Sequence, residues 1–260
     1  MKIGLTLSGG GSRGFAHLGV LKAIDDLGIK PSYISGSSAG ALVGALYCSG
    51  ISPVEIGKII KNNGITGSLK LAFNRFGLFS IERVQKIMLE HIPVNNFESL
   101  KIPLIVCTTD IKKGEATYFD SGELIKPVLA SCAIPGIFSP VMIDGVAHID
   151  GGVVNNLPVE PIEHKVDFKI GVNVMPEEKN MPVGSGKEIL MKCFMLTIGK
   201  QTIQKYDKFD ILIEPEKINR FDGLSLKKSE EMFDLGYNSA MKALKVSQLV
   251  GFQTLEITNN

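Results

Sequence analysis

Residues 33–40 have the sequence Tyr33-Ile34-Ser35-Gly36-Ser37-Ser38-Ala39-Gly40. This stretch predicts a short strand, a sharp turn and the start of a helix, and positions 36–40 fit the Gly-x-Ser-x-Gly pattern of a nucleophile elbow. Glycine at both ends of the turn leaves out a Cβ that would strike the neighbouring strand or helix. The N–H groups and the dipole at the start of the helix favour negative charge near Ser38. The stretch therefore predicts a serine hydroxyl that is held clear of the backbone.

The chain holds a second match to this pattern, Gly10-Gly11-Ser12-Arg13-Gly14, so the pattern alone does not distinguish Ser12 from Ser38. The longer run Gly9–Gly14 also fits G-x-G-x-x-G, the loop of a dinucleotide site, because it follows a strand and opens a helix. That interpretation lacks the acidic residue that should end the second strand. A phosphate-binding P-loop is disfavoured as well, because Phe15 stands where its lysine should be.

An oxyanion hole is the interpretation that we favour for this loop. Consecutive glycines allow the backbone N–H groups of Gly10, Gly11 and Ser12 to turn towards one point, and one such donor lowers the barrier by about 3–4 kcal/mol. A nucleophile turn needs an N–H group from a separate loop, and the loop after the first strand can supply it. Arg13 either adds positive charge at this point or forms a structural ion pair.

Strands and helices alternate on both sides of the elbow. The pattern predicts strands over residues 2–8, 33–35, 103–110, 116–119, 146–149, 168–174 and 210–213. It predicts helices over residues 15–27, 39–50, 53–62, 80–91, 123–132, 189–206 and 228–245, with Ser52 and Ser80 as N-caps and Gly28 as a C-cap. This alternation predicts an α/β protein with a parallel sheet covered by helices, and the length predicts a single domain over residues 1–260.

The composition indicates an ordered globular protein. The 260 residues are 44% hydrophobic and 21% charged, and the formal net charge of +1 gives no general attraction to nucleic acid. The first residues lack the apolar stretch of a secretory signal, and no apolar run is long enough to span a bilayer. We expect a cytoplasmic protein with buried, reduced thiols, because no CxxC pair occurs among Cys48, Cys107, Cys132 and Cys193.

A nucleophilic serine needs a base, and the chain offers two candidates. His148 and Asp150 are two residues apart on a predicted strand, so their side chains share one face. A Ser-His-Asp triad, in which the aspartate holds the far ring nitrogen, is awkward for such near neighbours. Asp150 precedes Gly151-Gly152 and can hydrogen bond a serine directly, although Asp-Gly alone predicts an ordinary turn. Packing or helix-end positions suit the other histidines better: His17, His91 and His164.

Together these motifs resemble the patatin-like phospholipase family. The family's pattern is Gly-Gly-Gly-x-Arg/Lys-Gly, then Gly-x-Ser-x-Gly, then Asp-Gly-Gly or Asp-Gly-Ala. This chain has Gly9–Gly14, Gly36–Gly40 and Asp150–Gly152 in that order, and residues 133–140 and 155–158 also resemble the family. The resemblance covers at least residues 2–158. It implies a three-layer α/β/α sandwich with a mainly parallel central sheet.

The resemblance also implies a function and a set of site residues. It implies a serine lipid acyl hydrolase (a phospholipase A, lysophospholipase or carboxylic ester hydrolase) that acts on a phospholipid or other fatty acyl ester. No metal or cofactor is implied. Ser38 would be the nucleophile and Asp150 its base, with an acyl-Ser38 intermediate. The oxyanion hole would come from Gly9, Gly10, Gly11, Ser12, Arg13 and Gly14, and the turns would be supported by Gly36, Gly40, Gly151 and Gly152.

Residues 64–79 mix apolar side chains with Lys70 and Arg75 and show no clear period. Such a mixture suits an interfacial surface or a lid over an acyl chain, and a partly buried connection explains it equally well. The first interpretation predicts peripheral membrane contact. Two other functions fit the motifs: a thioesterase or acyltransferase with the same dyad, and a non-catalytic module that binds lipid or nucleotide.

Overall fold

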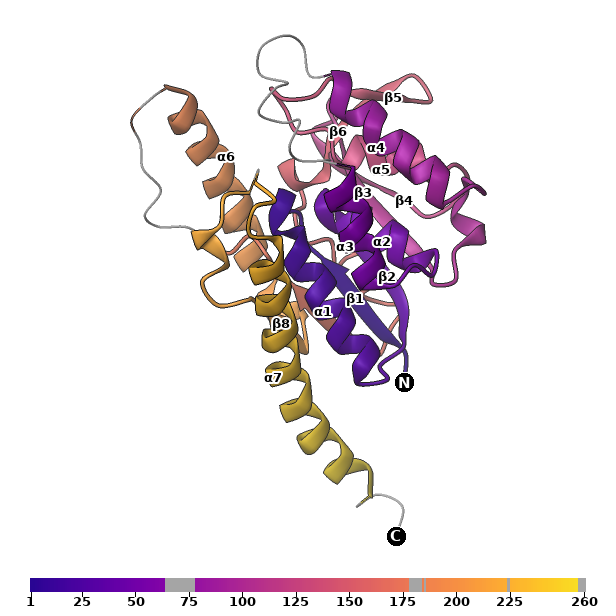
Figure 1. Cartoon of the computed structure of the whole chain (residues 1–260), viewed down its shortest axis with the longest axis vertical. Helices are drawn as coiled ribbons and strands as arrows, with labels where there is room; N and C mark the ends of the chain where they lie inside the picture. Colours follow the sequence, from indigo (N-terminus) through magenta and orange to yellow (C-terminus); the bar gives the residue numbers. More distant parts are fainter. Residues whose placement is uncertain (64–77, 178–183, 185, 224, 257–260) are drawn as a thin grey trace.

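The computed structural model describes residues 1–63, 78–177, 184, 186–223 and 225–256, and it contains a sheet of eight strands flanked by helices (Figure 1). The strands are β1 Ile3–Leu7, β2 Pro31–Ser37, β3 Leu104–Asp110, β4 Glu115–Phe119, β5 Val141–Ile143, β6 Val146–Asp150, β7 Phe168–Val172 and β8 Ile211–Ile213. Their order is β5-β6-β3-β2-β1-β7-β8, and β4 pairs with β3 off this path.

The pairings make this a mixed sheet with a parallel centre. Strands β3, β2, β1, β7 and β8 run parallel to one another, whereas β4 and β6 pair antiparallel with β3, and β5 pairs antiparallel with β6. All seven residues of β3 are buried, as expected of a strand covered on both faces. The predicted parallel sheet is confirmed, and its antiparallel edge carries the predicted Asp150.

Helices cover the sheet in separate layers. They are α1 Phe15–Asp26, α2 Ala39–Cys48, α3 Pro53–Asn62, α4 Leu78–His91, α5 Ile125–Ser131, α6 Gly186–Ile203 and α7 Ser229–Glu256. Helix α1 packs against α3 and α7, and α2 packs against α3 and α5. Along β1, Leu7 lies under Gly44 of α2, whereas a side chain at Gly4 would meet Ile162 and Val166. Because positions 4 and 7 point to opposite faces, the sheet lies between two layers, which confirms the three-layer architecture.

Local signals place most of the element ends correctly. Ser52 caps α3, where its Oγ accepts a hydrogen bond from the Glu55 N–H at 3.3 Å and Pro53 occupies the first helical position. Gly28 follows α1 with a φ of +69°, the left-handed conformation that ends many helices. The predicted cap at Ser80 is wrong, because α4 begins at Leu78 and Ser80 lies inside its first turn.

Other expectations are corrected or fall outside the described residues. Strand β5 has only three residues and was not predicted, since such a short run shows no period. The expectation of four buried thiols is also wrong, because Cys193 is exposed on α6 and Cys132 is only partly buried. Most of the segment 64–79 lies outside the described part of the chain. Among the described residues, no helix combines the length and the apolar character that a bilayer span requires.

Candidate active site

The elbow joins β2 to α2 at the carboxyl end of the sheet. Ser38 sits between Ser37, the last residue of β2, and Ala39, the first of α2, with a φ of +51° and a ψ of −121°. That conformation is rare for a residue with a side chain and costs of order 1–3 kcal/mol. A Cβ on Gly36 would lie 2.7 Å from the backbone of Gly40, and one on Gly40 would collide with the carbonyl of Leu7. Both predicted glycines are therefore required by the tight turn.

The sheet brings Asp150 to the elbow across two strand pairings. Ser37 is in register with Cys107 of β3, and the neighbouring Thr108 is in register with Asp150 of β6. The Ser38 hydroxyl donates a hydrogen bond of 2.6 Å to Asp150 Oδ2. Both side chains are buried, at 7% and 4% exposure. Two residues 112 positions apart thus form the direct serine–aspartate contact that the motifs imply.

The turn after β6 fixes the carboxylate of Asp150. Its Oδ1 accepts a hydrogen bond of 2.7 Å from the Gly152 N–H, and its backbone carbonyl accepts one of 2.9 Å from Thr109 Oγ1. A Cβ on Gly151 would collide with the carbonyl of Cys107, and one on Gly152 would lie 2.9 Å from Asp150 Oδ1. The two predicted glycines therefore let the turn close against β3 and against the carboxylate.

Burial controls the protonation of Asp150. Removal from water raises the pKa of its carboxyl to about 6, because it penalises the charged form. Hydrogen bonds from the Ser38 hydroxyl and the Gly152 N–H act in the opposite direction, since they stabilise the carboxylate. The group is thus ionised at neutral pH and is a stronger base than an exposed aspartate.

The histidines have other partners. His148 Nδ1 lies 3.0 Å from Thr108 Oγ1, and its ring packs edge-on against Phe119, with centroids 5.4 Å apart. His17 is fully buried, its Nε2 lies 2.7 Å from the carbonyl of Ser8, and burial lowers its pKa to about 4. It is therefore neutral, with Nε2 as the donor. His91 Nδ1 lies 2.9 Å from the Ile87 carbonyl of its own helix.

The glycine loop lies directly against the elbow. A Cβ on Gly9 would lie 3.1 Å from Ser38 Cβ, and one on Gly14 would lie 3.0 Å from Ala39 Cβ. Three N–H groups of the loop are already bonded: that of Gly9 to the Asn156 carbonyl, that of Ser12 to the Gly223 carbonyl and that of Arg13 to the Gly10 carbonyl. Within the described residues, the N–H groups of Gly10 and Gly11 have no such partner. These two N–H groups are therefore available to a bound group.

The far side of the loop is held by residues 219–223, which precede α7. Ser12 donates from its N–H to the Gly223 carbonyl and from its Oγ to the Asp222 carbonyl, each at 2.8 Å. Arg13 is buried, and its guanidinium donates to the Phe221 carbonyl at 3.0 Å and to the Asn219 carbonyl at 3.2 Å. These two predicted residues therefore support the loop from behind.

Two further residues at the site were not among the predicted ones. Ser131 of α5 accepts a hydrogen bond of 2.8 Å from the Ser38 N–H and donates one of 2.6 Å to the Cys107 carbonyl. The Asn156 amide is buried, and its Oδ1 would lie 2.5 Å from a Cβ on Gly9, so it separates the glycine loop from the Asp150 turn. The sequence did contain a signal for Asn156, because residues 155–158 resemble the family pattern after the Asp-Gly-Gly motif.

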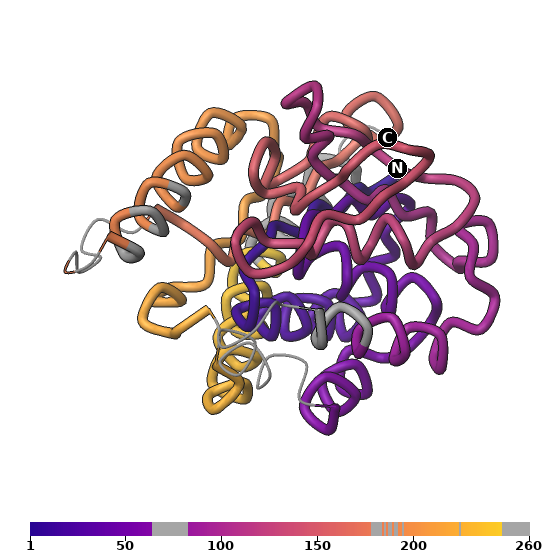
Figure 2. Tube along the Cα trace, turned by 90° about the horizontal axis from the view of Figure 1, so that it is seen from above, coloured from indigo at the N-terminus to yellow at the C-terminus, as the bar shows by residue number. Residues whose placement is uncertain are grey.

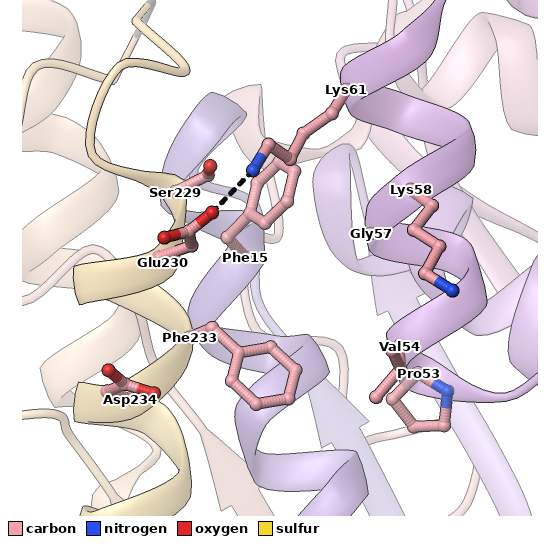
Figure 3. A pocket seen from close by; sticks show the side chains of 10 residues that line it. All are labelled: Phe15, Pro53, Val54, Gly57, Lys58, Lys61, Ser229, Glu230, Phe233 and Asp234. Atoms are coloured by element: carbon pink, nitrogen blue, oxygen red, sulfur yellow. Dashed lines mark hydrogen bonds and ion pairs between the residues drawn. The ribbon is translucent and has the colours of Figure 1, made fainter.

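A separate groove of about 230 Å³ lies between α3 and α7 (Figure 3). Phe15, Gly57 and Phe233 contribute to its apolar lining, and an ion pair of 2.7 Å between Lys61 and Glu230 crosses one end. None of the residues that line it belongs to the serine–aspartate pair or to the Gly9–Gly14 loop. We therefore assign the groove no part in the chemistry of Ser38.

Comparison with known proteins agrees with the motifs. The family model for patatin-like phospholipase matches residues 5–162. An uncharacterised NTE family protein of Mycobacterium bovis is 31% identical over 180 residues, which are 68% of this chain and 50% of that protein. A lysophospholipase of Emericella nidulans is 29% identical over 194 residues, 72% of this chain and 13% of its own length. The chain thus spans half or less of these relatives.

A solved structure supports the fold. VipD from Legionella pneumophila superposes with a TM-score of 0.54 and 14% sequence identity, over 94% of this chain and 67% of that one. At this identity the similarity concerns the arrangement of the sheet and its helices. It extends beyond residue 162, where the match to the family model ends, and so includes most of the C-terminal third.

Proposed function

Because the chain belongs to the patatin-like phospholipase family, we propose that it is a serine lipid acyl hydrolase that cleaves fatty acyl esters through Ser38 and Asp150. The observation that carries this proposal is the 2.6 Å hydrogen bond from the Ser38 hydroxyl to the buried carboxylate of Asp150. A nucleophilic serine needs an adjacent base, and the Asp150 carboxylate is close enough to take the proton directly, without a histidine. The relative named lysophospholipase is consistent with a phospholipid or lysophospholipid as substrate.

The proposed reaction has two halves. Ser38 Oγ attacks the ester carbonyl carbon while its proton passes to Asp150, and the carbonyl oxygen becomes an oxyanion. The intermediate collapses, the alcohol leaves with the proton from Asp150, and an acyl-Ser38 ester remains. Water then gives a proton to Asp150 and adds to the acyl carbon. The second collapse returns that proton to Ser38 Oγ and releases the fatty acid.

The N–H groups of Gly10 and Gly11 are proposed to bind the oxyanion. They are unpaired within the described residues, in a loop whose Gly9 is packed against Ser38. Donors that are fixed before the reaction need no rearrangement as charge develops, which is the source of their large effect. The bonds to residues 219–223 supply that fixation, so Arg13 acts as a positioning residue in this proposal.

Covalent labelling tests the proposal directly. We expect a fluorophosphonate to label Ser38, as identified by peptide mass spectrometry, because the reagent reports a serine with an adjacent base and an oxyanion hole. A label on Ser12 would contradict the assignment of the nucleophile. Absence of a label, with or without phospholipid vesicles, would contradict the hydrolase proposal and favour a binding module.

Arg13→Lys tests the support of the oxyanion loop. Lysine keeps the charge but cannot make the same set of bonds to Asn219 and Phe221, so the loop should lose its fixed position. We expect kcat for a water-soluble ester to fall on the order of tenfold to a hundredfold with little change in KM. The matched control is Arg220→Lys, at an exposed arginine paired with Glu231. A rise in KM with unchanged kcat would instead place Arg13 in substrate binding.

A further inference from the structure

Helix α6 carries an exposed apolar stripe. Three large apolar side chains, Ile189, Leu196 and Ile203, follow one another at intervals of seven residues and are 50%, 37% and 42% exposed. Cys193 and Lys200 lie between them on the same face and are also exposed. A seven-residue interval returns to nearly the same side of a helix, so these five residues form one continuous stripe, which we call the α6 stripe.

The opposite side of α6 is fixed to the body of the protein near the candidate site. Ile198 and Thr202 are buried, and a Cβ on Gly199 would lie 3.7 Å from Glu177. The helix contacts residues 151–153, the turn that follows Asp150. Just beyond it, Lys205 donates a hydrogen bond of 2.6 Å to Asn155 Oδ1 and pairs with Glu160 at 2.7 Å. The helix is therefore anchored and holds the stripe in a fixed place.

The arrangement of the elements leaves the stripe facing outward. Figure 1 shows α6 beside the end of the sheet where the elbow lies, and Figure 2 shows the helix at the periphery of the molecule. A helix that is apolar on several sides is usually covered by protein or lipid. Here the described side chains cover only the side with Ile198 and Thr202.

The charges on the stripe indicate what covers it. Lys200 is its charged residue, and none of the five carries a carboxylate. Large apolar side chains beside lysine are typical of a helix that lies in the surface of a membrane with negatively charged lipids. A coiled-coil contact with a second copy would place Lys200 near the Lys200 of that copy or within an apolar seam, and both arrangements are unfavourable.

We propose that the α6 stripe inserts into a lipid surface that carries negative charge and thereby brings Ser38 to its substrate. This proposal rests on the proposed function for the nature of the substrate. It gives α6 the interfacial role that the sequence suggested for residues 64–79, and it needs no contribution from that segment. The immediate partner is the lipid surface itself, before any single lipid enters the site.

Vesicle binding by protein that cannot hydrolyse lipid tests this proposal. In a Ser38→Ala background, Ile189→Asp combined with Leu196→Asp is expected to weaken co-sedimentation with phosphatidylcholine vesicles containing phosphatidylglycerol by more than tenfold. The matched control combines Val94→Asp, in the connection after α4, with Met142→Asp on β5, two residues that are 56% and 53% exposed. The control should change binding less than twofold. Thermal melts should show the same folded state for both variants, because all four positions are exposed.

The charge can be tested separately. Lys200→Gln should reduce the preference for vesicles with phosphatidylglycerol over pure phosphatidylcholine, and binding to pure phosphatidylcholine should change less. Failure of the Ser38→Ala parent to bind vesicles, or equal binding by parent and stripe variant, would overturn the proposal. Light scattering that shows a dimer in the parent and a monomer in the stripe variant would identify a contact between copies instead. Fluorophosphonate labelling of Ser38 does not depend on vesicle binding. It therefore tests the proposed function separately from the proposal for the α6 stripe.

Discussion

Ser38→Ala is expected to reduce ester hydrolysis by about a thousandfold or more and to abolish labelling by a fluorophosphonate. The proposed covalent intermediate forms on Ser38 Oγ, and alanine has no atom that could replace it. The remaining rate would come from water attacking an ester that the oxyanion hole still binds. Measurement of kcat with a water-soluble ester separates this chemical loss from any effect on lipid binding.

Ser12→Ala is the matched control for Ser38→Ala. Ser12 occupies the other Gly-x-Ser-x-Gly match, but its hydroxyl donates to the Asp222 carbonyl and is not paired with a carboxylate. Loss of this hydrogen bond should cost about 1 kcal/mol of stability and lower kcat by less than tenfold. Equal losses in the two variants would contradict the assignment of Ser38, and full activity of Ser38→Ala would refute it.

The parts of the site that are local in sequence could be predicted. The elbow and the Asp-Gly-Gly turn depend on glycines whose reason is steric: a Cβ at Gly36, Gly40 or Gly151 would strike backbone close to the turn. A steric constraint of this kind fixes the residue type within the motif, so it leaves a visible pattern even where the residue that would be struck is distant in the chain. The parallel sheet was predictable for the same reason, because strand–loop–helix alternation permits few arrangements.

The parts that depend on distant residues could not be predicted. Arg13 bonds to Asn219 and Phe221, which lie 206 and 208 positions away, and nothing in residues 219–223 marks them as partners of a glycine loop. Ser131 reaches the Ser38 N–H from α5 in the same way. A backbone carbonyl or N–H group can be supplied by almost any residue type. The partners of such bonds therefore leave no pattern in a single sequence.

Asp150→Asn is expected to lower kcat by at least about a hundredfold, because an amide cannot take the proton from Ser38. The geometry should survive: the amide oxygen can still accept from the Gly152 N–H, and the amide nitrogen can donate to Ser38 Oγ. In the parent protein, kcat/KM should rise with pH and then reach a plateau. The apparent pKa of this rise should be near that of Asp150, which is about 6. A profile that is flat between pH 5 and 7 would contradict the role of Asp150 as the base.

The same substitution should stabilise the protein at neutral pH. Burial raises the pKa of Asp150 from 3.8 to about 6, so the folded protein holds this proton more tightly than the unfolded chain does. The stability from this group is fully present below pH 3.8 and is lost as pH rises through about 6. Asparagine never carries the buried charge, so Asp150→Asn should gain about 1–3 kcal/mol at pH 8 and almost nothing below pH 4.

Denaturant unfolding of the parent and of Asp150→Asn at pH 4 and pH 8 measures this difference. The matched control is Asp110→Asn, at another buried carboxylate at the end of β3, the strand that pairs with β6, whose Oδ1 accepts the N–H groups of Lys112 and Lys113. Loss of the charge weakens those two hydrogen bonds, so this control should be destabilised at pH 8. An increase in the free energy of unfolding for Asp150→Asn and a decrease for Asp110→Asn at pH 8 would show that the charge of Asp150 destabilises the fold, as expected of a group that is retained for its chemistry. A destabilised Asp150→Asn protein at pH 8 would instead mean that the carboxylate is part of the structural framework, and the serine would then need another base.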